Sequence, residues 1–116
     1  MKFKDYESEG VVIIELSGKV MGGDQKTRFH GRIHEYINQN LKNFVIDMNG
    51  VERMNSVGVG MLTSALTTVS RAGGRLVLAN ITNIKSLLTM THLIAVFPHY
   101  DSREAALASY STPAMR

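Results

Sequence analysis

Three runs of apolar residues stand out in the hydrophobic pattern and predict buried strands. They occupy residues 11–16, 44–48 and 75–79 and are rich in valine, isoleucine and leucine, as expected for strands that are covered on both faces. The charged stretch 2–7 precedes the first run and predicts an edge strand that pairs with it in a hairpin. A shorter apolar run at 95–97, ahead of a proline, predicts one more strand.

Between these strands, apolar residues recur at helical spacing. We expect Asp24 to cap a first helix, and Gly73-Gly74 to end a second helix over residues 56–71. A short helix follows at 84–88, and Asp101 is expected to cap a last helix. Because strand and helix patterns alternate after the initial hairpin, the sequence predicts an α/β domain with a mostly parallel sheet and an antiparallel edge.

The segment between the middle strand and the second helix places a hydroxyl at a helix N-terminus. Asn49-Gly50 is expected to end the strand as a turn, and either Asn55 or Ser56 can cap the helix. A phosphate on Ser56 would be stabilised there by the helix dipole and by free N–H groups; alternatively, Ser56 serves only as a cap. Gly58 and Gly60 weaken the helix, either to expose its backbone to another surface or to pack it tightly on the sheet.

Composition narrows the class of protein. A chain of 116 residues fits one domain, and the absence of cysteine excludes disulfides, thiolate zinc sites and a cysteine nucleophile. The net charge is +3, but the thirteen lysines and arginines form no run, which argues against direct nucleic-acid binding. No apolar run is long enough to span a membrane, and the N-terminus lacks the apolar core of a signal peptide. We therefore expect a cytoplasmic protein without a membrane segment.

Motifs for catalysis or cofactor binding are missing from the sequence. There is no glycine-rich phosphate loop, and Met54 stands where a nucleophile elbow around Ser56 needs glycine. His30 and His34 have a spacing that can bind a metal but lack further ligands, so we interpret them as surface histidines. Asp47 is interpreted as the polar end of its strand. The sequence thus predicts neither an enzyme, nor a cofactor, nor a metal site.

Residues 44–62, FVIDMNGVERMNSVGVGML, resemble the central signature of STAS domains of the anti-sigma factor antagonist type. These domains typically have a strand with an aspartate, a small turn, and then Asp-Ser followed by Gly-Leu-Gly. The similarity continues through 71–80, 87–93 and 96–106. It implies the STAS fold over residues 1–110, with a single mixed, mostly parallel sheet of about five strands, an antiparallel N-terminal edge and about four helices. Residues 111–116 are then expected to be a frayed tail.

The resemblance also implies a function in partner switching. Unphosphorylated antagonists of this family bind an anti-sigma factor, which is a serine kinase of the GHKL ATPase type. This kinase phosphorylates the serine after the aspartate, and a PP2C-type phosphatase removes the phosphate. By this resemblance the chain is a bacterial regulator of transcription, and a kinase substrate and not a catalyst. Ser56 is then the phosphorylation site, and the partner-binding residues are Asn55, Ser56, Val57, Gly58, Val59 and Met61, with Asp24 and the 22–23 loop at the opposite rim. Independently of the resemblance, the small size of the domain and the exposed edge of its hairpin predict a monomer or weak dimer.

Asn55 departs from the family pattern, which has aspartate at this position. Asparagine keeps the capacity to cap the helix but lacks the charge. It favours an alternative in which the domain is never phosphorylated and acts as a constitutive binding subunit of a signalling or transport assembly. A second alternative is a small nucleotide- or ligand-binding domain, because some STAS domains have been proposed to bind nucleotides.

Overall fold

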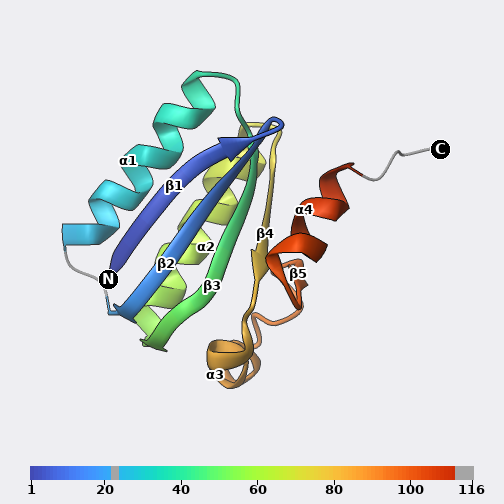
Figure 1. Ribbon diagram of the computed structural model, residues 1–116. Coiled ribbons are helices and arrows are strands. Elements are labelled where there is room, and N and C mark those ends of the chain that lie inside the picture. The colour runs from blue at the N-terminus through green and yellow to red at the C-terminus, as the bar shows by residue number, and fades with distance from the viewer. Residues whose placement is uncertain (22–23, 112–116) are drawn as a thin grey trace.

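A single five-stranded sheet in the order β1-β2-β3-β4-β5 forms the centre of the molecule (Figure 1). The computed structural model describes residues 1–21 and 24–111. The hairpin pair β1 and β2 is antiparallel, and every later pair is parallel. This confirms the predicted mixed sheet with its antiparallel N-terminal edge. The strands are β1 (Lys2–Ser8), β2 (Val11–Val20), β3 (Asn43–Met54), β4 (Arg75–Ala79) and β5 (His99–Tyr100).

Helices cover both faces of this sheet. The core on one face joins the strands to α1 (Asp24–Asn38), α2 (Ser56–Arg71) and the short pair η1 (Thr82–Ile84) and α3 (Lys85–Met90). A smaller core on the other face joins the strands to α4 (Arg103–Ser111). The buried side chains of β2 alternate between the two cores, which explains why its sequence is continuously apolar.

Strand β3 is longer than the sequence predicts. Asn49-Gly50 was expected to end it, but the strand continues to Met54 because the pairing with β2 resumes after an irregularity near Ser17. A Cβ atom on Gly50 would lie 2.9 Å from the Cβ atom of Ser17. The glycine therefore serves the close approach of two strands and not a turn.

The last strand of the sheet also differs from the prediction. Residues 95–97 were expected to form it, but they form turns, and β5 follows Pro98 instead. The carbonyl groups of Pro98 and Tyr100 accept hydrogen bonds from the backbone N–H groups of Leu78 (2.9 Å) and Asn80 (3.1 Å). The apolar side chain of Phe97 packs into the core from outside the strands, and it is only 1% exposed. A buried aromatic in a turn and an apolar strand residue cannot be distinguished by hydrophobicity alone.

Helix α4 has its cap one residue after the predicted one. Its first turn is capped by Ser102, whose hydroxyl accepts a hydrogen bond from the N–H group of Ala105 at 3.0 Å, so Asp101 is not the cap. The helix continues to Ser111. Near its end, the Tyr110 hydroxyl lies 2.8 Å from the carbonyl oxygen of Phe44 on β3. This contact anchors the last turn of α4 to the sheet.

Candidate functional site

The junction between β3 and α2 is built around Asn55. This residue has extended backbone angles, and its side-chain oxygen accepts a hydrogen bond from the N–H group of Gly58 at 3.0 Å. Asn55 is therefore the N-cap of α2. The interpretation of Ser56 as the cap is wrong, because Ser56 is already the first residue of the helix.

Ser56 presents an exposed hydroxyl at the N-terminus of α2. Within the described part of the chain, this hydroxyl makes no hydrogen bond. The first turn of α2 holds no acidic residue, and the first N–H groups of a helix have no partner within it. A negative charge added at Ser56 would therefore meet the positive end of the helix dipole without a like charge in the same turn.

The two glycines after Ser56 have different roles. A Cβ atom on Gly58 would lie only 2.3 Å from the carbonyl oxygen of Val20 and 2.8 Å from the Cγ atom of Met54. Gly58 thus lets the helix start lie directly on the ends of β2 and β3. Gly60 is exposed, and a Cβ atom there would meet nothing within 4 Å. Gly58 therefore matches the explanation of tight packing on the sheet, and Gly60 matches the explanation of an exposed backbone.

Only some of the residues predicted to contact a partner are exposed to solvent in the structure. Val57 is 49% exposed beside Ser56, whereas Val59 (4%) and Met61 (1%) are buried in the core. The expectation that Val59 and Met61 contact a partner is therefore corrected, because a periodic α2 turns these positions toward the sheet. Asp24 is the first residue of α1, but its side chain and the 22–23 loop lie outside the described residues.

Asp47 is a buried polar residue whose role the sequence did not reveal. It lies within β3, at 6% exposure, and not at the end of a strand. Its Oδ1 atom accepts hydrogen bonds from the N–H group of Asn49 (3.0 Å) and the side-chain amide of Asn80 (2.9 Å). The Nε atom of Arg103 lies 3.6 Å from its other oxygen. Asp47 therefore joins β3 to the end of β4 and to α4. The sequence feature that could have indicated this role is the position of an aspartate inside an apolar run.

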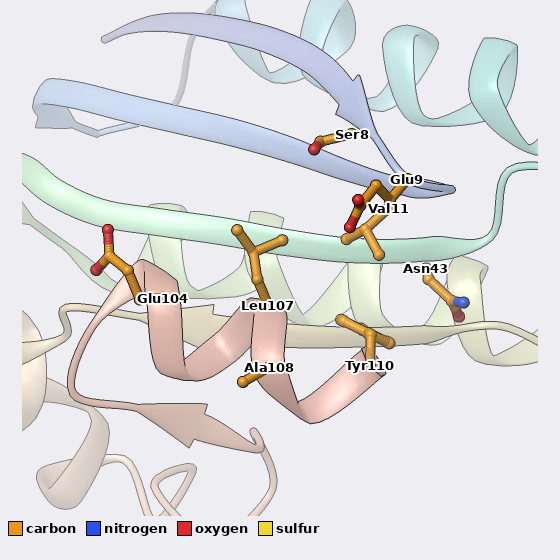
Figure 2. A pocket seen from close by; sticks show the side chains of 8 residues that line it. All are labelled: Ser8, Glu9, Val11, Asn43, Glu104, Leu107, Ala108 and Tyr110. Atoms are coloured by element: carbon orange, nitrogen blue, oxygen red, sulfur yellow. The ribbon is translucent and has the colours of Figure 1, made fainter. Parts of the chain in front are cut away.

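A pocket of about 440 Å³ lies at the other end of β3 from Ser56, where Figure 2 shows it between the hairpin turn and α4. Its apolar floor includes Leu107, and Glu9 and Glu104 bring carboxylates to its rim. The lining contains no lysine or arginine, so it is poorly suited to the phosphates of a nucleotide. The lining residues are Ser8, Glu9, Val11, Asn43, Glu104, Leu107, Ala108 and Tyr110.

The two histidines of α1 differ in their surroundings. His34 is exposed, as predicted, whereas His30 is half-buried and its Nε2 atom is buried without a hydrogen-bond partner in the described structure. Among residues 1–21 and 24–111, no group of three or more histidine, aspartate or glutamate side chains is placed to hold a metal ion. None of the described helices is both long and apolar enough to cross a membrane.

Comparisons with known proteins agree with this architecture. The STAS domain family model matches residues 2–106. TM1081 of Thermotoga maritima, a candidate anti-sigma factor antagonist, has a TM-score of 0.83 at 20% identity, over 95% of both chains. The unphosphorylated anti-sigma factor antagonist SpoIIAA has a TM-score of 0.73 at 19% identity, over 95% of this chain and 97% of its own. No curated protein matches the sequence significantly.

One solved structure with the same fold comes from a transport family. A sulfate transporter family protein from Wolinella succinogenes has a TM-score of 0.78 at 22% identity, over 90% of this chain and 87% of its own. At such identities the likeness establishes the fold alone. The STAS fold that the sequence resemblance implied is confirmed.

Proposed function

Because this chain belongs to the STAS domain family, we propose that it is an anti-sigma factor antagonist that is switched off by phosphorylation of Ser56. The observation that carries this proposal is the division of tasks between two neighbours. Asn55 caps α2, which leaves the exposed Ser56 hydroxyl without a structural bond among the described residues. A kinase can therefore modify Ser56 without removing the cap of the helix.

The proposed switch needs no refolding of the domain. Phosphorylation adds about −1.5 to −2 charges at pH 7, and the N-terminus of α2 tolerates that charge within the protein. A partner that packs against Ser56, the exposed Val57 and the bare backbone at Gly60 would have to bury the same charge. Burying a charge without a counter-ion is costly, so the complex dissociates while the domain stays folded.

The partners in this proposal are proteins. The unphosphorylated domain binds an anti-sigma factor of the GHKL ATPase type, which is also the serine kinase for Ser56. A PP2C-type phosphatase restores the binding form. This assignment is supported by the family of the chain and by two solved structures with this fold, which represent SpoIIAA in unphosphorylated and phosphorylated forms. The chain itself is a substrate in this scheme and supplies no catalytic group.

Asn55 favours one alternative function. It places a neutral amide beside Ser56 where the family has a carboxylate, and that amide is already bonded to Gly58. If the missing charge is needed to orient or activate the serine, the domain binds its partner constitutively, as a subunit of a signalling or transport assembly. Replacement of Asn55 by aspartate tests this point, because it restores the family residue and keeps the cap.

The decisive experiment is an affinity capture from lysate of the source cell with wild-type, Ser56→Ala and Ser56→Asp baits. We expect wild type and Ser56→Ala to retain an ATPase-fold serine kinase, and Ser56→Asp to lose it. Ser64→Asp is the matched control, since Ser64 is also exposed on α2 but lies two turns away. Equal retention by all baits, together with no phosphate on Ser56 after incubation with the captured kinase and ATP, would contradict the switch and support constitutive binding.

A further inference from the structure

A row of basic side chains follows the junction between α1 and α2. Lys26, His30 and His34 are spaced at i, i+4 and i+8 along α1, so they lie on one side of the helix. That side faces α2, because His34 and Arg71 line the same shallow groove of about 350 Å³. The backbone of Met61, also on α2, lies close enough to His30 to favour its protonated form.

The described side chains supply no counter-charge to this row. Helix α2 contains no acidic residue in sixteen positions. Glu35 of α1 is engaged by Arg32 at 2.9 Å, on the side of the helix that faces β1 and where Arg32 also binds Asp5 at 2.8 Å. Burial, followed by repulsion from His34 and Lys26, lowers the pKa of His30. His34 and Lys26 therefore both oppose a positive charge on His30 along this side of α1.

The groove also offers an apolar floor at its C-terminal end. Ile37 of α1 and Ala72 beyond α2 line it together with Thr68. An occupant that matches these features has carboxylates in a row beside apolar side chains.

We propose that the groove between α1 and α2 is a docking surface for an acidic amphipathic helix of a partner protein. Carboxylates of that helix pair with Lys26, His34 and Arg71, and an apolar side chain packs on Ile37. The groove is shallow, which suits side chains of a docked helix better than an enclosed small molecule. Arg71 lies roughly 22 Å along α2 from Ser56 at the helical rise per residue, so the end of the groove at Arg71 and Ile37 is separate from the proposed phosphorylation switch, and the proposal does not depend on that switch.

A single-stranded nucleic acid fits these observations less well. Such ligands are held by extended basic grooves together with aromatic side chains on which bases stack. The described lining of this groove contains no aromatic residue other than histidine, and Arg71 is its one lysine or arginine, so it is not an extended basic groove. Charge complementarity and the apolar floor together favour a peptide helix.

The test uses the full chain, labelled with ¹⁵N, and a synthetic amphipathic peptide that carries glutamates on one edge and leucines on the other. We expect the peptide to shift the amide resonances of Ile37, Thr68 and Ala72 most strongly, and raised salt to weaken binding. A peptide with lysines in place of the glutamates is expected not to bind. The double variant Lys26→Gln, Arg71→Gln should raise Kd roughly fivefold, the effect of two exposed ion pairs.

The matched control is the double variant Lys4→Gln, Lys85→Gln, which removes the same charge from two exposed positions on β1 and α3. It is expected to bind the acidic peptide as wild type does. The proposal is overturned if the acidic peptide does not bind, if its shifts map elsewhere, or if both double variants weaken it equally. Shifts in the groove produced by single-stranded RNA but not by the peptide would overturn it as well.

Discussion

Asn55 and Ser56 are adjacent residues with separate tasks. Both side chains can accept a hydrogen bond from the first turn of a helix, and the structure gives that bond to Asn55 alone. Ser56 then lies one position inside the helix with its hydroxyl exposed. A modification at Ser56 therefore changes charge at the surface and leaves the cap intact.

This division predicts unequal effects of two substitutions. Asn55→Ala should lower the free energy of unfolding by about 1 kcal/mol, because the N–H group of Gly58 loses its partner. Ser56→Ala should change it by less than about 0.5 kcal/mol, as expected for an exposed side chain without a partner. Urea unfolding followed by circular dichroism measures both. Asn55→Asp is the control and should retain wild-type stability; a cost of Ser56→Ala as large as that of Asn55→Ala would show that the cap is misassigned.

At the scale of elements, the start of α2 is fixed by the strands beneath it. The backbone N–H group of Asn55 donates to the carbonyl oxygen of Val20 at 3.4 Å, and Gly58 lies against the same carbonyl. The position of Ser56 is thereby set by the C-terminal ends of β2 and β3. This edge, where parallel strands end and helices begin, is a common location for functional sites in α/β proteins.

The same geometry predicts opposite effects for two glycine-to-alanine substitutions. Gly58→Ala should destabilise the protein, because overpacking against the Val20 carbonyl costs about 1–3 kcal/mol and outweighs a helix-propensity gain of about 1 kcal/mol. Gly60→Ala should stabilise it by up to about 1 kcal/mol, since the added methyl meets open space. Thermal unfolding of both variants is the measurement. Equal stabilisation by both would mean that α2 does not lie on β2 as described.

At the scale of the whole molecule, two cores lie on opposite faces of one sheet, and α4 binds the first three strands of that sheet through Arg103. Arg103, its first residue, donates hydrogen bonds to the hydroxyl of Tyr6 on β1 (2.7 Å) and to Glu15 on β2 (2.6 Å). The same side chain approaches Asp47 on β3. Helix α4, the N-terminal hairpin and β3 therefore meet at one arginine, which favours a single cooperative unfolding transition.

The half-buried His30 predicts how this global stability depends on pH. Burial is the main cause of its lowered pKa, with further lowering by His34 and Lys26. The unfolded chain then binds a proton more readily than the folded protein below about pH 6.5, so stability falls as the pH drops from there through the folded-state pKa. Urea unfolding from pH 7.5 to pH 5 should show this loss, and His30→Gln should reduce it. Parallel pH profiles for the two proteins would exclude His30 as the cause.

Much of this architecture could be predicted because it rests on local and periodic signals. The boundaries of α2 were predicted correctly from its apolar periodicity and the Gly73-Gly74 stop. The errors concentrate where two distant segments meet. The local sequence predicts that a strand ends at Gly50 and that another ends at Pro98. Pairing with β2 instead continues β3 past Gly50, and hydrogen bonds to β4 place β5 after Pro98. No local pattern contains that information.

The sequence by itself determined the family, the alternation of strands and helices, and the presence of a serine at a helix start, because periodicity, turn residues and the signature at 44–62 are local properties. Only the tertiary structure decided which residue caps α2, which glycine packs and which is bare, and that Val59 and Met61 are buried. It alone brought His34 of α1 beside Arg71 of α2. These outcomes depend on contacts between elements far apart in the chain, and only the folded packing defines them.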